Sequence, residues 1–313
     1  MDSANRRDFL RTVTIAGAGL ALGGSSLMAA EKKKSVLLFT KSSGFEHDVI
    51  KTPNGQPSIV ENVLRDLGKK HGFEVTATKD GRIFSSPEFR QHSALFFYTT
   101  GILTQAGTDK NPPMTEAGKK ALLDSIYDGQ GFIGAHAASD SFHTQPENED
   151  RSSRYQTYGE KSDPYLRMLG GEFINHGREP RLITTDLIVD DPTFPGLEGV
   201  KSPVSFREEW YSLKDFREDI HVILTLETKG MPGEIYQRSP FPVTWNRMHG
   251  KGRVFYCAIG DLKESWANPF FLNLLGGGIR WSIGDVKAKL DHNLKTAAPG
   301  YAEIPPKFPP EKK

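Results

Sequence analysis

Four short apolar runs alternate with amphipathic segments over the first half of the chain, and this order limits the fold more than any other feature. The runs end near residues 39, 77, 98 and 135 and are typical of strands buried on both faces of a parallel sheet. Between them, residues 58–71 and 115–127 place their apolar side chains on one helical face. The order strand, helix, strand, strand, helix, strand predicts an α/β fold with a single-domain, doubly wound, mostly parallel sheet.

The second half continues the same domain without an internal repeat. Residues 269–283 are predicted to form a last helix, and the polar stretch 144–163 is interpreted as a surface insertion or lid. We expect one domain over residues 31–285 and an extended Lys/Pro-rich tail over residues 286–313. Strands are predicted at 182–189, 205–211, 222–226, 242–245 and 252–259.

The first thirty residues have the pattern of an export signal. Arg6-Arg7 begins a twin-arginine motif, a short apolar stretch follows, and small residues lead to Ala29-Ala30. Residues 1–30 are therefore predicted to be a twin-arginine signal peptide, with the mature protein in the periplasm or outside the cell. Met28 makes the cleavage site imperfect, which leaves an uncleaved membrane anchor open.

Composition excludes several classes of protein. The formal net charge is +1 and no basic stripe stands out, so nucleic acid is not an expected partner. The single cysteine, Cys257, rules out an internal disulfide, and its apolar surroundings indicate a small core residue rather than a nucleophile. A homo-oligomer is left open.

Two predicted loops at the carboxyl ends of strands carry histidines, and ligands of doubly wound sheets bind at those ends. His47 lies in the first loop, and Gly134-Ala135-His136-Ala137-Ala138 forms the second. Small residues around one functional residue are typical of a nucleophile elbow, but a histidine at its tip makes acyl transfer through Ser or Cys unlikely. His136 is a candidate general base, polarising donor or metal ligand, or else a buried histidine bonded to the backbone.

Further polar groups accompany the histidines. Asp140 follows His136 by four residues and could orient it or transfer a proton, or simply cap a turn. In Glu208-Glu209-Trp210-Tyr211 two carboxylates stand beside two aromatic rings, an arrangement that can shift a pKa and stack a sugar, or form a solvated edge strand. His176 is either a ligand or a residue that braces its loop.

Several ordered blocks together resemble the ThuA-like (trehalose utilisation) family, from about residue 35 to residue 284. The resemblance implies a class I glutamine amidotransferase-like fold in which histidine replaces the catalytic cysteine, and a link to disaccharide use through keto-sugar intermediates. Family members often have Gly-His after the last strand, where this chain has Gly260-Asp261; a carboxylate there can still bind a metal or accept a proton. The blocks are residues 44–48, 134–140, 169–176, 208–211, 242–245, 250–256 and 278–281.

The candidate site is assigned accordingly. A divalent metal, zinc or another first-row ion, is a candidate cofactor, and no nucleotide is expected. His47, His136 and His176 are the proposed metal ligands, with Glu209 or Asp261 as a further one. The catalytic candidates are His136, Glu209 and Asp140, and the substrate-binding candidates are Asp48, Trp210, Tyr211 and Trp245.

Three functional hypotheses remain open from the sequence. The first is an exported enzyme that acts on a sugar or keto-glycoside, as a hydrolase or as an isomerase or lyase that moves a proton next to a carbonyl. The second is a carbohydrate-binding protein with the same pocket and no chemistry. The third is a surface interaction module, which predicts scattered histidines and no pocket.

Overall fold

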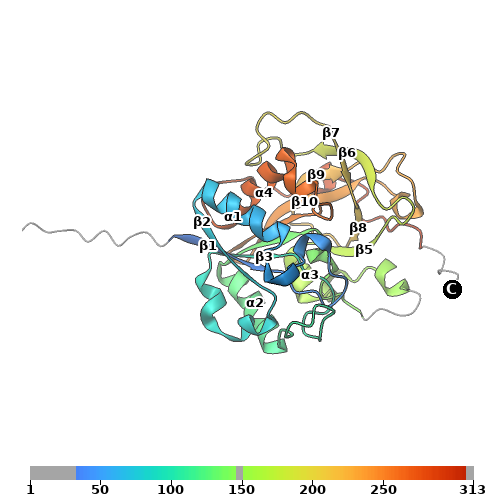
Figure 1. Cartoon of the computed structure of the whole chain (residues 1–313). Coiled ribbons are helices and arrows are strands. Elements are labelled where there is room, and N and C mark those ends of the chain that lie inside the picture. Colours follow the sequence, from blue (N-terminus) through green and yellow to red (C-terminus); the bar gives the residue numbers. More distant parts are fainter. Residues whose placement is uncertain (1–32, 146–150, 308–313) are drawn as a thin grey trace, which may run out of the picture. The chain divides into compact units, whose positions relative to one another are not determined.

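The computed structural model describes residues 33–145 and 151–307. The predicted twin-arginine segment lies outside the described residues, as does part of the polar insertion. From Lys33 onward the described residues belong to one compact unit. A nine-stranded sheet runs through this unit, with helices on both of its faces (Figure 1).

The sheet has the strand order β2-β1-β3-β4-β11-β10-β9-β6-β7. Strands β2, β1, β3, β4 and β11 pair parallel to one another, whereas the remaining pairs are antiparallel. Only β10 and β6 run against the direction of the other strands in the sheet, which confirms the predicted mostly parallel α/β architecture. The strands are β1 (Lys34–Phe39), β2 (Phe73–Thr78), β3 (Ala94–Phe97), β4 (Gly131–Ala135), β6 (Ile183–Val189), β7 (Val204–Glu208), β9 (His221–Leu226), β10 (Phe241–His249) and β11 (Gly252–Cys257).

Two helices cover each face of the parallel half of the sheet. Helices α1 and α4 pack together on one face, and α2 and α3 pack together on the other (Figure 1). No helix among the described residues is both long enough and apolar enough to cross a membrane. The α-helices are α1 (Ile59–His71), α2 (Glu116–Asp128), α3 (Pro164–Leu169), α4 (Pro269–Ser282) and α5 (Leu294–Ala297). The 3-10 helices are η1 (Asp48–Ile50), η2 (Pro53–Gly55), η3 (Gly81–Ser85), η4 (Pro87–Gln91), η5 (His136–Asp140), η6 (Ser152–Tyr155), η7 (Gly159–Lys161), η8 (Glu234–Tyr236) and η9 (Ser265–Ala267).

Local sequence explains where the first helices begin and end. The Ser58 hydroxyl accepts a hydrogen bond from the Glu61 amide at the start of α1, and Gly72 ends the helix in the left-handed conformation. Thr115 caps α2 in the same way by accepting from the Gly118 amide. These caps fix how each helix returns the chain to the sheet.

The structure differs from the sequence-based expectation in two places. The strand predicted over 205–211 is two strands, β7 and β8 (Tyr211–Lys214), with Glu209 and Trp210 between them. Strand β8 pairs with β5 (Glu172–His176) in a separate two-stranded sheet. The described part of the tail is packed as well as extended, since Leu294 and Ala298 are buried.

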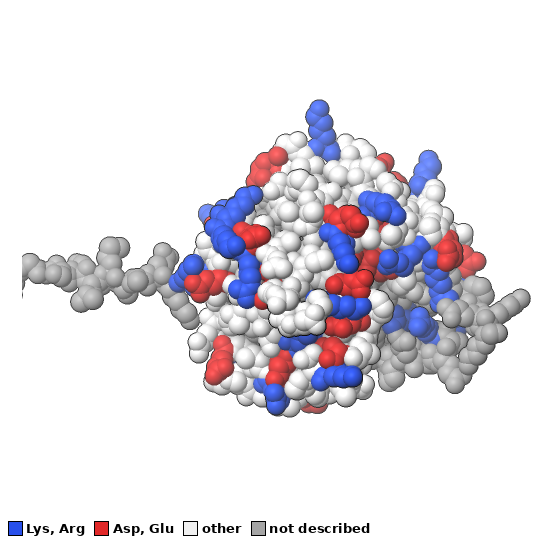
Figure 2. Space-filling view, in the orientation of Figure 1, with Lys and Arg blue, Asp and Glu red and all other residues white. Residues whose placement is uncertain are grey.

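Charged side chains of both signs are interspersed on the face of the molecule shown in Figure 2. No large area of a single sign stands out on that face. Mixed charge of this kind does not favour binding to a polyanion.

Candidate active site

A cleft of about 1100 Å³ opens at the carboxyl ends of the parallel strands. The loops after β1 and β11 contribute His47 and Asp261 to its lining, and the turn after β4 carries His136 directly behind it. Parallel strands end at the same edge of a sheet, so these three loops meet although they are far apart in sequence. Glu209 joins them from the break between β7 and β8.

The turn after β4 holds His136 in an unusual backbone conformation. Its φ is +42°, in the left-handed region that side chains other than glycine rarely adopt. Hydrogen bonds keep it there, because the Tyr256 hydroxyl donates to the His136 carbonyl oxygen at 2.8 Å. A side chain at Gly134 would come within 2.9 Å of Leu169, which explains the small residue before the histidine. The predicted elbow is therefore present as a strained, tightly packed turn.

The ring of His136 is fully buried, and its orientation is fixed from one side. Its Nδ1 lies 2.8 Å from the Ala258 carbonyl oxygen, which can only accept, so Nδ1 carries the hydrogen. In the neutral ring Nε2 then has a free lone pair. This Nε2 atom is buried, has no hydrogen-bond partner among the described residues, and lies 3.6 Å from Oε2 of Glu209.

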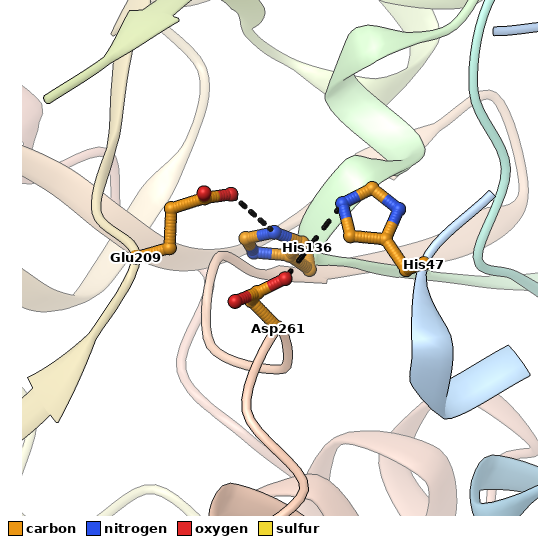
Figure 3. Close-up of side chains that lie close together, drawn as sticks. All are labelled: His47, His136, Glu209 and Asp261. Atoms are coloured by element: carbon orange, nitrogen blue, oxygen red, sulfur yellow. Dashed lines mark ion pairs between the residues drawn. The ribbon is translucent and has the colours of Figure 1, made fainter. Parts of the chain in front are cut away.

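His136 and three other side chains, His47, Glu209 and Asp261, come together here (Figure 3). One donor atom from each of His47, His136, Glu209 and Asp261 lies within 4.8 Å of all the others. His47 is nearly buried, and its Nε2 is 4.0 Å from Oδ1 of Asp261 and 3.3 Å from the Tyr211 hydroxyl. Two imidazoles and two carboxylates at this spacing form a donor set suited to a first-row divalent ion.

Arg181 binds the outer side of the two carboxylates. Its Nη1 donates to Oε1 of Glu209 and to Oδ2 of Asp261, each at 2.7 Å. Each carboxylate therefore gives one oxygen to the guanidinium and turns the other toward a histidine. The Arg181 side chain is 46% exposed, so it lies between the cluster and the open cleft.

The loop that carries Asp261 is held by Glu208, the neighbour of Glu209. Glu208 is fully buried and accepts hydrogen bonds from the Gly260 amide at 3.0 Å and the Ser265 hydroxyl at 2.7 Å. The Trp266 indole donates to the Gly260 carbonyl oxygen at 2.8 Å. Of the two consecutive glutamates, one thus positions the loop and the other faces the cleft.

The charged neighbours decide the ionisation of the cluster. Burial, helped by the neighbouring His136, lowers the pKa of His47 to about 3. Burial acts to raise the pKa of Glu209, but His136, His176 and Arg181 outweigh it and lower that pKa to about 2. Burial acts to lower the pKa of His136, but Glu209 and Asp261 outweigh it and raise that pKa. Near neutral pH Glu209 is ionised and His47 is neutral.

Asp140 lies elsewhere than expected. The short helix η5 does not place it against His136; instead its Oδ1 is 2.6 Å from Nε2 of His143. His143 also contacts Glu172 through Nδ1 at 3.1 Å. The orienting partner of His136 is the Ala258 carbonyl oxygen rather than Asp140. Asp140 lines the cleft and braces one of its walls.

Two of the four substrate-binding candidates lie in the core. Trp210 and Trp245 are fully buried, and their indoles donate to the carbonyl oxygens of Ile183 and Leu169. Neither tryptophan lines the cleft, so the expectation that they offer stacking faces is corrected. Each tryptophan side chain points into the core because its ring packs there and its N–H group has a hydrogen-bond acceptor there. Asp48 and Tyr211 do line the cleft.

His176 is near the cluster but outside the four-donor set. Its Nδ1 donates to the Gly177 carbonyl oxygen at 2.8 Å and lies 3.6 Å from Oε1 of Glu209. His176 was predicted as a metal ligand, but Asp261 stands in its place in the four-donor set. Sequence reasoning missed Arg181, which stands in no motif, and the positioning role of Glu208.

The α/β domain and its mostly parallel sheet, with a histidine turn at the carboxyl edge, are consistent with a glutamine amidotransferase-like fold. The chain belongs to the ThuA family, described as trehalose utilisation, whose model matches residues 35–282. Membership indicates a role in trehalose utilisation or carbohydrate metabolism. Cys257, the only cysteine, is buried in β11.

Solved structures with the same fold include two proteins described as ThuA-like. One from Bacteroides uniformis is 19% identical, with a TM-score of 0.59, over 85% of this chain and 97% of that one. One from Parabacteroides merdae is 18% identical, with a TM-score of 0.51, over 88% of this chain and 98% of that one. At these identities the likeness establishes the fold. No match to the chain is found among curated proteins.

Proposed function

We propose that the protein is an enzyme that acts on a sugar or keto-glycoside at the cluster of His47, His136, Glu209 and Asp261. The reaction class is hydrolysis or proton transfer next to a carbonyl. The observation that carries the proposal is Nε2 of His136, a buried ring nitrogen without a hydrogen-bond partner among the described residues, which faces an ionised carboxylate at the base of a polar cleft. Family membership supports a carbohydrate as the substrate.

The donor set fits one divalent ion of the zinc type. Metal-bound histidines commonly donate their second ring N–H to a backbone carbonyl, as His136 does to Ala258. His47, His136 and Asp261 would hold the ion, since catalytic sites usually keep three protein ligands and one open position. Donors 4.8 Å apart or less need shifts of about 1 Å to reach ligand distances near 2 Å. When bound, the ion would polarise a carbonyl or water oxygen.

The remaining residues would do the proton chemistry and the binding. Glu209 is the proton-transfer group, because it faces both His136 and the cleft. Asp140, together with His143, shapes the wall beside it rather than acting on His136. Tyr211 and Asp48 offer hydroxyl and carboxylate contacts to a sugar.

We also propose that the folded protein is exported by the twin-arginine route to the periplasm or beyond. The proposal rests on the Arg6-Arg7 motif and the apolar stretch after it. Export of a folded chain suits a site that is assembled from four distant segments. A fusion of residues 1–30 to a reporter that is active only after export would test it.

The reaction is tested in D₂O by proton NMR. The full mature chain, with one equivalent of Zn²⁺, is incubated with a panel of keto-glycosides, that is, glycosides with one ring hydroxyl oxidised to a carbonyl. We expect loss of the proton next to the carbonyl, release of the second sugar, or both. Glu209→Gln should slow the reaction roughly 10²- to 10⁴-fold, the usual contribution of a positioned acid or base.

Glu264→Gln is the matched control, because Glu264 is an exposed carboxylate on the same cleft. It should react at the wild-type rate. If the wild type binds the glycosides without any exchange or cleavage, the protein is a carbohydrate-binding protein and the enzymatic proposal fails. Equal rates for wild type and Glu209→Gln would remove Glu209 from the mechanism.

A further inference from the structure

One large apolar side chain stands exposed at the cleft. Phe45 is 69% exposed and lines the cleft. Among the described residues the other exposed large hydrophobic side chains are Tyr127 and Leu290, and neither lines the cleft. An exposed aromatic ring at a binding site is more informative than one on an open surface, because such rings provide much of the contact area in recognition sites.

The backbone around Phe45 is held firmly. The Thr100 hydroxyl donates to the Phe45 carbonyl oxygen at 2.8 Å, and the Ser43 amide donates to the Thr100 carbonyl oxygen at 2.8 Å. The Thr108 hydroxyl donates to the Gly44 carbonyl oxygen. These hydrogen bonds fix the backbone of three successive residues, which presents Phe45 at the cleft. A loop backbone that is fixed in advance loses little conformational entropy when a ligand binds.

The ring of Phe45 contacts His47, which in turn contacts His136 at the proposed reaction centre. Its ring centroid is 5.0 Å from that of His47 in an edge-to-face contact, and the His47 centroid is 5.2 Å from that of His136. Phe45 is therefore separated from the buried histidine by a single imidazole. A sugar ring that reacts over His136 and Glu209 would have its neighbour in the region of Phe45.

The surroundings of Phe45 suit a sugar better than a purely apolar ligand. The Ser43 hydroxyl donates to the Gln105 carbonyl oxygen, so residues 104–105 lie beside the Phe45 loop. Thr104, Gln105 and Asp48 line the same cleft and offer polar groups to ring hydroxyls. A sugar presents C–H groups on its face and hydroxyls at its rim, which matches an aromatic ring bordered by polar side chains.

We infer that Phe45 is the stacking surface for a second sugar ring, so that the site takes a disaccharide or longer glycoside rather than a single sugar. The inference rests on the proposed function and names the class of substrate. Trp210 and Trp245 are buried and Tyr211 is 3% exposed, so Phe45 supplies the open aromatic face that these residues cannot.

Calorimetric titration of the full mature chain tests this with two probes, trehalose and methyl α-glucoside. Phe45→Ala should weaken trehalose binding roughly five- to tenfold, the worth of one aromatic contact, and leave methyl α-glucoside within twofold. Phe45→Trp should retain trehalose binding. Tyr127→Ala is the control, because it removes a ring that is 60% exposed away from the cleft.

Unchanged trehalose binding in Phe45→Ala, an equal loss for both probes, or no trehalose binding by the wild type would overturn the inference. So would a dimer, seen by sedimentation, that Phe45→Ala converts to a monomer, because the ring would then be an interface residue. The binding test does not depend on turnover. If Phe45→Ala weakens trehalose binding but no reaction occurs in D₂O, only the enzymatic proposal is contradicted. If the reaction occurs but Phe45→Ala has no effect on binding, only this inference is contradicted.

Discussion

His136 combines backbone strain, burial and a nitrogen without a hydrogen-bond partner among the described residues, and each property depends on a different neighbour. Tyr256 holds its carbonyl oxygen, Ala258 fixes its ring, and Glu209 faces its Nε2. A non-glycine residue with positive φ costs about 1–3 kcal/mol and persists only where the surroundings enforce it. The surroundings here aim one imidazole nitrogen at a carboxylate, which is how a ligand or proton carrier is prepared in advance.

Asp190, which lies away from the cleft, is a second residue whose ionisation is made unfavourable by the fold. Burial raises the pKa of Asp190 to about 6, and its Oδ2 has no hydrogen-bond partner among the described residues. The folded protein binds this proton more tightly than the unfolded chain, whose aspartates titrate near 3.9. The protonated Asp190 carboxyl therefore makes its full contribution to the stability of the fold below about pH 4. This contribution is lost as the pH rises through 6 and the carboxyl ionises.

Asp190→Asn should remove the stability loss that ionisation of Asp190 causes above about pH 4. We expect the free energy of unfolding to rise by about 1–2 kcal/mol at pH 7.5, after allowance for partial solvent screening, and to be unchanged at pH 4. Urea unfolding at the two pH values measures both. Asp186→Asn, at an exposed position on β6, which ends one residue before Asp190, should change little at either pH. Equal or lower stability of Asp190→Asn at pH 7.5 would show that the half-buried Asp190 carboxylate does not destabilise the fold.

At the scale of elements, the site depends on the segments that follow the strands rather than on the strands. Glu208, at the end of β7, faces the 260–265 loop, and Glu209, in the break between β7 and β8, faces the cleft. Glu208 satisfies the Gly260 amide and the Ser265 hydroxyl, so the loop and the break are one hydrogen-bonded unit. The position of Asp261 follows from this unit.

Glu208→Ala should therefore act on both stability and the site. Loss of the carboxylate leaves buried donors without an acceptor, at about 1–3 kcal/mol each, so we expect unfolding to become easier by roughly 3 kcal/mol. The Asp261 loop should loosen, and Zn²⁺ affinity should fall tenfold or more, as after loss of other supporting groups. Glu208→Gln, which keeps one acceptor oxygen, should show a smaller loss of stability and of Zn²⁺ affinity. Unchanged Zn²⁺ affinity in a destabilised Glu208→Ala would confine Glu208 to a structural role.

The strands of the large sheet and the helices α1, α2 and α4 could largely be predicted from the sequence, whereas β5, β8, α3 and α5 were not. The one-sided apolar pattern marked the helices over 58–71 and 115–127, and the apolar runs marked the strands. The break at Glu209 and Trp210 was not visible, because strand pairing depends on neighbours that are distant in the sequence. The tryptophans were misplaced for the same reason: burial is set by tertiary neighbours that local patterns do not contain.

At the scale of the whole molecule, the sheet brings together residues that the sequence keeps apart. His47, His136, Glu209 and Asp261 come from four segments, and the parallel half of the sheet ends three of these at one edge. The elbow and the candidate glutamates were identifiable from local motifs. The choice of Asp261 over His176, and the bridge made by Arg181, needed the three-dimensional arrangement.

The account depends most on the claim that this cluster holds one divalent ion, and anomalous diffraction from crystals soaked in Zn²⁺ tests it most directly. We predict one strong peak about 2.0–2.2 Å from Nε2 of His47, Nε2 of His136 and a carboxylate oxygen of Asp261, absent from His136→Gln crystals. A peak elsewhere that survives His136→Gln, or no peak in wild-type crystals, would contradict the claim.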